Sequence, residues 1–222
     1  TADIQFVTLA TGGDTQRFGE LVRLRYRLPG ASNSTRGLTF GGRYPGQNGV
    51  NEIDYITIAT EGNAQDFGDL TAAVHESGAL ASSTRGVNFG GETAPASGAL
   101  VNTIEFVTIA TTGNSQDFGD LTQGRGNFTG LCSSTRGVFA GGSNPANNII
   151  DFVTIASAGN ASDFGDMLTG NTVASCSTSN NTRGVIMGGD LQPSNAFTNT
   201  MQFVTIATTG DSQDFGDMIT VG

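Results

Sequence analysis

The chain has 222 residues, a formal net charge of −10 and 33 glycines, and all 10 of its cationic residues are arginines. No cluster of basic residues follows a groove-like pattern, so the composition argues against a nucleic-acid partner. No stretch reaches the ~18–20 apolar residues that a membrane-spanning helix needs, and an acidic surface disfavours adhesion to anionic membranes.

Two sequence cassettes recur along the chain, and their spacing is its main structural signal. One is TRGVFAGG at Thr135–Gly142, and the other is FVTIATTGNSQDFGDL at Phe106–Leu121. The arginines of the first cassette lie 49, 51 and 47 residues apart, at Arg36, Arg85, Arg136 and Arg183. A period of about fifty residues, built from short apolar runs and glycine turns, predicts a radial all-β array.

The elements can be placed in chain order within a single domain, 1–222. Residues 1–21 contain only two strands, c and d, of the repeated unit, and each later unit contains four strands, a to d. The complete units are expected at 22–70, 71–121, 122–167 and 168–222. In the unit at 122–167, the expected strands are Asn127–Ser134, Gly137–Ala140, Ile149–Ser157 and Ser162–Met167.

The apolar residues of each unit predict sheets that are covered on both faces. Strand c carries Ile150 and Phe152 on one face and Val153 and Ile155 on the other, which a sheet between two neighbouring sheets requires. The double glycine after strand b is expected where a Cβ atom would clash with the next sheet. The phenylalanine of each DFGD sequence is expected to fill the space between sheets; these residues are Phe67, Phe118, Phe164 and Phe215, with Phe18 in the first copy.

This layout resembles the kelch repeat, in which an apolar strand ending in Gly-Gly is followed by a variable loop, an apolar strand, a tight turn and an aromatic residue. The chain departs from the kelch pattern in two ways. The aromatic residue is Phe instead of Trp, and the upstream Tyr is replaced by Thr or Ser. The resemblance implies a kelch-like β-propeller of four-stranded antiparallel blades. Four full blades and a half-blade would form either a five-bladed ring or a segment of a larger one.

The wording of the cassettes, STRGVFAGG followed by IDFVTIASAGNASDFGD, also resembles repeat proteins of tailed bacteriophages, notably phages of marine cyanobacteria. This resemblance implies a non-enzymatic structural protein of the virion, in a tail fibre or another attachment or decoration structure. The implied location is the virus particle. The implied partners are other virion subunits in an oligomeric assembly and, through variable loops, a glycan on the host surface.

The connections between strands predict two different faces. The a–b and c–d turns are near copies of one another, whereas the b–c and d–a connections vary in length and content. Because loops on a rigid scaffold often carry recognition residues, the variable face is the candidate binding surface. Drift in unconstrained loops would produce the same variation, so both interpretations stay open. The candidate binding residues are Tyr26, Arg43, Tyr44, His75, Glu76, Glu92 and Phe197.

The uniform face is interpreted as structural. Each TRG arginine is expected near the DFGD carboxylates, so that pairs such as Arg136 with Asp117, Asp120 or Asp163 form charge-assisted hydrogen bonds. A calcium site where Asn160, Asp163 and Asp166 approach one another is a weaker alternative, because the EF-hand spacing is absent. The arginines at 23, 25 and 27 are more typical of one irregular loop or strand edge than of a phosphate site.

The sequence lacks the residues for most kinds of catalysis. His75 is the only histidine, and Cys132 and Cys176 are the only cysteines, so no ligand set for structural zinc is expected. The cysteines occupy roughly matching places in adjacent units, where two small buried residues fit better than a disulfide. We predict no enzymatic activity, no metal and no cofactor. Two alternatives remain: a polysaccharide glycosidase or lyase using carboxylates such as Glu76 and Glu92, and a kelch-type protein-interaction module.

Overall fold

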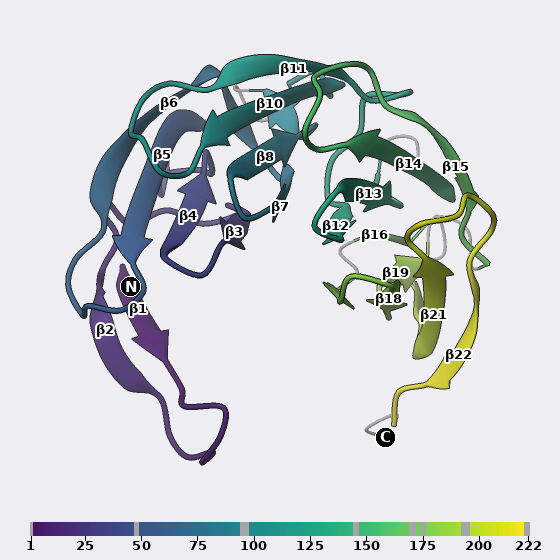
Figure 1. Ribbon diagram of the computed structural model, residues 1–222, viewed down its shortest axis with the longest axis horizontal. Helices are drawn as coiled ribbons and strands as arrows, with labels where there is room; N and C mark the ends of the chain where they lie inside the picture. The colour runs from purple at the N-terminus through teal and green to yellow at the C-terminus, as the bar shows by residue number, and fades with distance from the viewer. Residues whose placement is uncertain are drawn as a thin grey trace.

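The computed structural model describes residues 2–46, 49–93, 98–143, 147–168, 176–191 and 196–219, and the backbone of 172–173. Every regular element in this part of the chain is a β-strand, and all paired strands are antiparallel. A two-stranded hairpin is followed by four sheets that each contain the expected strands a to d. The sheets follow one another around an open arc, with the hairpin at one end and the fourth sheet at the other (Figure 1). The expected all-β class and the four-stranded antiparallel sheets are confirmed, whereas the arc in Figure 1 is not a closed ring.

The strands of these units are as follows. The N-terminal hairpin consists of β1 (Asp3–Phe6) and β2 (Gln16–Glu20). The first sheet consists of β3 (Gly30–Ser32), β4 (Arg36–Phe40), β5 (Val50–Thr57) and β6 (Gln65–His75). The second consists of β7 (Gly78–Ala81), β8 (Arg85–Phe89), β10 (Thr103–Thr108) and β11 (Gln116–Asp120). The third consists of β12 (Thr129–Cys132), β13 (Arg136–Ala140), β14 (Ile149–Thr154) and β15 (Ser162–Asp166). The fourth consists of β17 (Cys176–Ser179), β18 (Arg183–Met187), β21 (Thr200–Thr205) and β22 (Gln213–Asp217).

Short strands that the sequence did not predict lie in the variable connections. β9 (Glu92–Thr93) joins the edge of the first sheet by pairing with β6, which runs across the expected unit boundary at 70/71. β16 (Thr172–Val173), β19 (Asp190–Leu191) and β20 (Ala196–Phe197) form a small sheet of their own. In the third sheet, strand a is shorter than expected and strand c ends at Thr154. Parts of the variable b–c loops, at 47–48, 94–97, 144–146 and 192–195, lie outside the described residues.

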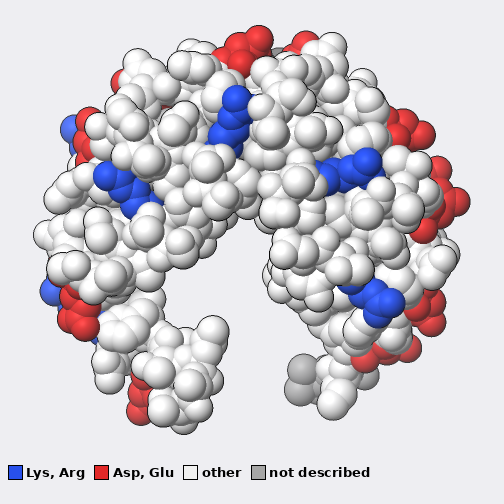
Figure 2. Space-filling model, in the orientation of Figure 1, with Lys and Arg blue, Asp and Glu red and all other residues white. Residues whose placement is uncertain are grey.

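Each sheet is ordered from the inside of the arc to the outside. Strands a, such as β3, β7 and β12, lie innermost, and strands d, such as β6, β11, β15 and β22, lie at the outer edge (Figure 1). The DFGD aspartates belong to strands d. This position accounts for the acidic side chains that gather around the outer rim in Figure 2. Much of the chain's negative charge therefore lies away from the inside of the arc.

The apolar core lies between sheets. Three apolar clusters of described residues each span two neighbouring sheets; one joins Phe118 of the second sheet to Val153 and Ile155 of the third. Phe67, Phe118 and Phe164 are each 2% exposed, which confirms their expected role. The prediction is wrong for Phe215, which is 49% exposed because no described sheet follows the fourth. Phe18, in the hairpin, is half-buried.

The repeated glycines allow neighbouring sheets to approach closely. Gly90, in the double glycine after β8, has φ +58°, and a Cβ atom there would lie 2.6 Å from the Arg125 carbonyl oxygen. Gly119 of DFGD has φ +142°, and its Cβ would lie 2.5 Å from the Gly159 carbonyl carbon of the next sheet. Both positions therefore require glycine. The expected reason for the double glycine is confirmed.

The sequences of the c–d turns are nearly the same in every unit because each turn makes the same contact. It forms hydrogen bonds with the outer strand of the preceding unit, and we call this contact the clamp. The Gly159 and Ala161 N–H groups donate to the Phe118 and Asp120 carbonyls at 2.6 and 2.7 Å, and the Asp120 N–H donates to Asn160 Oδ1 at 3.0 Å. Equivalent bonds join the hairpin to the first sheet, the first to the second, and the third to the fourth. Because Asn160 serves in this clamp, its side chain has a structural role.

The arginines of the TRG cassettes do not form the expected ion pairs with DFGD carboxylates. Each guanidinium instead stacks on the aromatic ring of strand c in its own sheet. Three of them also donate to a backbone carbonyl in the next sheet, and Arg183 has no such bond among the described residues. The donor bonds are Arg36 to Ile109 O (2.7 Å), Arg85 to Ile155 O (2.7 Å) and Arg136 to Ile206 O (3.0 Å). The rings lie 4.2–4.6 Å away and belong to Tyr55, Phe106, Phe152 and, for Arg183, Phe203. The physical reason is topological, because the aspartates lie on the outermost strand while the arginine points to the turn of the following sheet.

The two cysteines do not form a disulfide. Cys132 is half-buried, Cys176 is exposed, and both are free thiols. The expectation of two buried cysteines is therefore wrong for Cys176.

Among the described residues there is no helix with the length and apolar character needed to cross a membrane.

The contrast between Phe118 and Phe215 provides a test of the packing between sheets. Replacing Phe118 by Ala removes a ring that is 2% exposed and should lower the free energy of unfolding by about 3–5 kcal/mol. Phe215→Ala is the matched control, since the same repeat position is 49% exposed there, and its cost should be well under half as large. Urea unfolding monitored by circular dichroism measures both. Equal losses would show that these rings stabilise their own sheets and not the contacts between sheets.

Candidate functional site

The variable connections lie on one side of the arc, as expected. In each unit, backbone pairing joins the d–a connection to the start of the b–c loop. The pairs are Tyr26 with Arg43, His75 with Glu92, Gly126 with Ser143, and Val173 with Asp190. We call this side the variable face.

A hollow of about 490 Å³ opens where the innermost strands meet the variable face. It is lined by the starts of β3, β7, β12 and β17 and by the connections that precede the first three. Arg27, Glu76 and Asn127 occupy the same position in three successive units, and we call these three residues the rim ladder. They are the described non-glycine residues with positive φ, at 55°, 56° and 55°. Since L-residues disfavour this conformation, the backbone here is held by its surroundings.

Hydrogen bonds connect the members of the rim ladder. The Glu76 N–H donates to the Arg27 carbonyl at 3.1 Å, and the Asn127 N–H donates to the Glu76 carbonyl at 2.8 Å. Between the side chains, the Arg27 guanidinium donates to Glu76 Oε1, and Asn127 Nδ2 donates to Glu76 Oε2 at 2.6 Å. Glu76 thus bridges a cation and an amide, one from each neighbouring unit.

His75 lies directly behind the rim ladder. Its side chain is 1% exposed, and its Nε2 atom lies 3.8 Å from Glu92 Oε2. Burial lowers the pKa of His75 below its usual value, and the positive charge of Arg43 lowers it further, while Glu92 opposes the shift. The imidazole is therefore held mainly neutral near pH 7.

His75, Glu76 and Glu92 also form the one group of potential metal ligands among the described residues. Their ligand atoms lie within 4.8 Å of one another. Imidazole and carboxylate are ligands that a zinc ion accepts. However, Arg27 already binds Glu76, and Arg43 adds further positive charge nearby. A cation would have to compete with the guanidinium of Arg27, so the geometry supports an ion-paired site better than a metal site.

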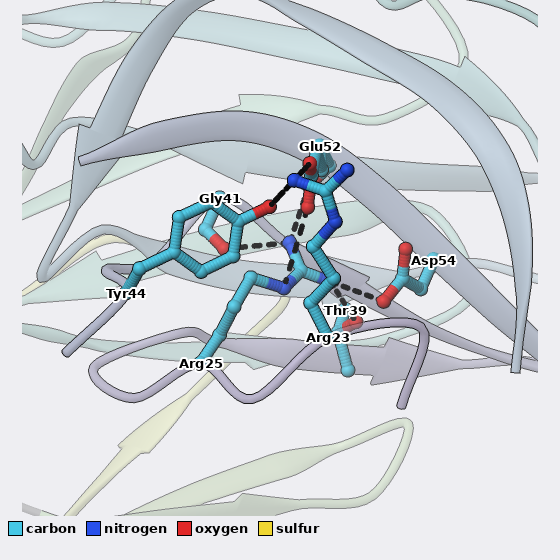
Figure 3. A network of polar contacts seen from close by, with 7 residues as sticks. All are labelled: Arg23, Arg25, Thr39, Gly41, Tyr44, Glu52 and Asp54. Atoms are coloured by element: carbon cyan, nitrogen blue, oxygen red, sulfur yellow. Dashed lines mark hydrogen bonds and ion pairs between the residues drawn. The ribbon is translucent and has the colours of Figure 1, made fainter. Parts of the chain in front are cut away.

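A second polar network joins the first sheet to the segment that precedes β3 (Figure 3). Arg25 is completely buried; its Nη1 donates to the Gly41 and Glu52 carbonyls at 2.8 Å each, and its Nη2 donates to Asp54. Burial raises the pKa of Asp54, and Arg25 opposes that shift. The three arginines at 23, 25 and 27 were expected in an irregular loop or at a strand edge. The middle one, Arg25, is instead a buried residue of the core.

The outer part of this network contains Tyr44. Its hydroxyl donates to Glu52 Oε1 and accepts a 3.2 Å hydrogen bond from Arg23 Nη1 (Figure 3). Burial and the bond to Glu52 raise the pKa of Tyr44. Arg23 also lies over the Tyr44 ring, with its Cζ atom 5.6 Å from the ring centre. Tyr44 is thus held in a fixed position, whereas Tyr26 is 42% exposed and available for contact.

The third sheet contains a counterpart of the Arg25–Asp54 pair. Arg125 Nη2 lies 3.0 Å from Asp151 Oδ2, and both side chains are 0% exposed. Thr122 Oγ1 donates to Asp151 Oδ1 at 2.7 Å. Burial lowers the pKa of Arg125, and Asp151 opposes the shift. The second and fourth sheets carry Glu105 and Gln202 at the Asp151 position, bound by hydroxyl and N–H donors.

The seven predicted binding residues thus divide into separate groups. The structure brings His75, Glu76 and Glu92 together, pairs the backbones of Tyr26 and Arg43, and places Tyr44 in the first-sheet network. Phe197 is 89% exposed on β20, in the small sheet of β16 and β19, and does not join them. Sequence reasoning missed Arg27 and Asn127, although their alignment with Glu76 in the repeat was a usable signal.

Comparisons with known proteins do not assign this site. None of the protein-family models searched matches the chain, and the search of curated proteins found no match either.

The buried His75 makes a pH dependence testable. Because its pKa is lowered from 6.5 in the folded chain, the unfolded chain binds the proton more readily. The stabilisation of the neutral form is complete above pH 6.5 and decreases as the pH falls below 6.5 towards the folded-state value. Between about pH 6.5 and 5, the free energy of unfolding should fall more steeply for the wild type than for His75→Gln. Parallel curves from urea unfolding would contradict this account.

The buried Arg125–Asp151 pair gives a second prediction. Asp151→Leu leaves the Arg125 guanidinium buried without its counter-charge and should cost about 3–5 kcal/mol of unfolding free energy. The double variant Arg125→Met/Asp151→Leu should recover most of that loss, because no charge remains buried. Glu20→Gln, which removes an exposed partner of Arg17, is the control and should change little. Failure of the double variant to recover stability would show that the loss came from packing and not from the unpaired charge.

Proposed function

We propose that this chain is a non-enzymatic structural and binding module of a virus particle, in a tail fibre or another attachment or decoration structure. In this proposal its sheets are the blades of a kelch-like β-propeller, either a five-bladed ring or a segment of a larger one. The virion assignment draws on the resemblance of the cassettes to phage repeat proteins. The binding role draws on the division of polar side chains between the two faces.

That division is the observation that carries the proposal. Two kinds of recurring polar side chain make contacts within the scaffold. Arg36, Arg85 and Arg136 of the TRG cassettes bind the next sheet. The turn residues clamp the preceding sheet; they are Asn63, Asn114, Asn160 and Asp211. The charged side chains that differ between units, Arg27, Glu76 and Glu92 among them, gather on the variable face. A scaffold with uniform internal contacts and an individual surface is suited to recognition.

The proposed ligand is a glycan of the host surface. The hollow of about 490 Å³ beside the rim ladder offers hydrogen-bonding groups from Arg27, Glu76 and Asn127. Tyr26, in the first unit's d–a connection, adds an exposed aromatic ring. Arg27, Glu76 and Asn127 also have positive φ angles. Residues held in this unfavourable conformation occur often at functional sites. Other virion subunits are the proposed partners in assembly.

Glycan-array binding of the purified chain tests the recognition role. Tyr26→Ala and Asn127→Ala should each lower glycan binding at least about tenfold, since a lost contact of about 1.4 kcal/mol has that effect. Glu61→Gln, an exposed substitution in a c–d turn, is the matched control and should leave binding unchanged. Labelling of intact virus particles with an antibody against the chain tests the location. A chain that binds no glycan and labels no particle would contradict the proposal.

One observation favours a second candidate, hydrolysis of a polysaccharide. Carboxylate oxygens of Glu76 and Glu92 lie within 4.8 Å of one another, close to the ~5–5.5 Å separation used by retaining glycosidases. Against it, both oxygens of Glu76 accept hydrogen bonds from neighbouring side chains. Release of reducing ends from host polysaccharide, abolished in both Glu76→Gln and Glu92→Gln, would establish this activity. We expect no release by the wild type.

A further inference from the structure

The hollow beside the rim ladder has a balanced charge. Among the described residues that line it, Arg27 is the one cation and Glu76 the one anion. The two form an ion pair across the boundary between the first and second units. The hollow therefore offers polar groups to a ligand without an excess of either charge.

The charges behind the rim ladder are balanced as well. Arg43 and Glu92 act on the buried His75 with opposite charges, and the imidazole itself is mainly neutral near pH 7. The chain as a whole has a net charge of −10, which repels anions at long range. An acidic ligand thus meets repulsion on approach and, in the described lining of the hollow, no cation that lacks a counter-charge.

The rim ladder nevertheless has hydrogen-bonding groups to spare. Arg27 uses Nη1 to bind Glu76, and no described residue accepts a hydrogen bond from its Nε or Nη2 atom. Its side chain is 50% exposed. Asn127 uses Nδ2 to bind Glu76 and, at 3.5 Å, Ser143, and no described residue donates to its Oδ1 atom. Free donors and a free acceptor therefore lie on the same ladder.

Glu76 fixes which atom of the Asn127 amide is free. An ionised carboxylate only accepts hydrogen bonds, so the amide nitrogen faces Glu76 and Oδ1 is left for a ligand. A sugar hydroxyl both donates and accepts, so neighbouring hydroxyls can bind Arg27 and Asn127 at the same time. A carboxylate or sulfate on the sugar has no proton to donate to Asn127, and it would lie near the negative charge of Glu76.

The hollow extends across several units. Its lining comes from equivalent positions in four successive units, and its volume of about 490 Å³ falls within the ~300–1,000 Å³ range of ligand pockets. The two free groups belong to the first and third units, with Glu76 of the second unit between them. A ligand that uses both groups must therefore cross the second unit, which suits an oligosaccharide better than a single small polar molecule.

We propose that the ligand of the rim ladder is a neutral oligosaccharide, with hydroxyl groups and no carboxylate, phosphate or sulfate, and that the Arg27–Glu76 pair sets this preference. The inference rests on the proposed glycan-binding function and specifies its substrate class. Glu76 has two roles in it, because it cancels the charge of Arg27 and orients the Asn127 amide. Arg27 and Asn127 are the residues that contact the hydroxyls.

An array of oligosaccharides in matched pairs tests the preference. The two members of a pair differ only at the exocyclic carbon of one sugar, which is a hydroxymethyl group in the neutral member and a carboxylate in the acidic member. The wild-type chain should bind neutral members at least about tenfold more tightly than acidic ones. Because a neutral ligand carries no charge to screen, raising sodium chloride from about 50 to about 500 mM should change this binding little.

Three variants make the test specific to the ion pair. Glu76→Gln leaves Arg27 without its counter-charge in a side chain of similar shape, so binding of acidic members should rise at least about tenfold and should weaken at high salt. The double variant Arg27→Gln/Glu76→Gln removes both charges and should lose that gain. Glu61→Gln is the matched control, because it makes the same charge change in an exposed c–d turn and should keep the wild-type preference. Circular dichroism checks that every variant folds.

Two results would overturn this inference while leaving glycan recognition in place. One is a wild type that binds acidic members as tightly as neutral ones, or more tightly. The other is an unchanged preference in Glu76→Gln, since the ion pair would then not set it. A wild type that binds neither kind of member overturns the proposed function itself, and the substrate class with it, so the two failures are distinguishable.

Discussion

The contact between consecutive sheets is the interaction on which the rest of this structure depends. A sheet of four short strands cannot bury both of its apolar faces alone, so each unit is stabilised by its neighbours. The contact combines a backbone clamp with an apolar cluster. In the clamp, a turn such as Gly159–Ala161 binds the outer strand of the preceding sheet, and Gly119 permits the close approach. The phenylalanine of that same strand is buried in the cluster.

The contact between sheets also accounts for the positions of most arginines in the chain. A guanidinium that recurs in the four sheets serves the scaffold: it stacks on an aromatic ring of its own sheet, and in the first three sheets it also donates to a carbonyl of the next sheet. Two units hold a further buried arginine, Arg25 or Arg125, which an aspartate of strand c neutralises. A register shift in every c–d pair falls immediately before this position. The side chains left for recognition are those that differ between units and lie around the hollow.

The two ends of the arc show that the burial of residues at equivalent repeat positions depends on their surroundings. Ile58 and Ile109 both lie in a TIAT sequence, but Ile58 is 43% exposed and Ile109 0%, because the described part of the unit before Ile58 contributes only β1 and β2. Phe215 repeats Phe118 and is 49% exposed, because no described sheet follows it. These differences follow the position of each residue along the array.

Local sequence patterns were enough to predict the all-β class, the unit length, the order of strands and most of the apolar residues of the core. Glycine pairs, apolar runs and repeated turns are local signals, and they specify local backbone geometry directly. Which groups meet across units, by contrast, follows from the packing of the sheets. The TRG arginines bind carbonyls and not carboxylates, because strand d carries the aspartates to the outer rim. Likewise, the ladder of Arg27, Glu76 and Asn127 exists because residues about fifty positions apart lie side by side on neighbouring units. Repetition predicts which residues are equivalent, but their partners depend on the angle and register at which one sheet packs on the next.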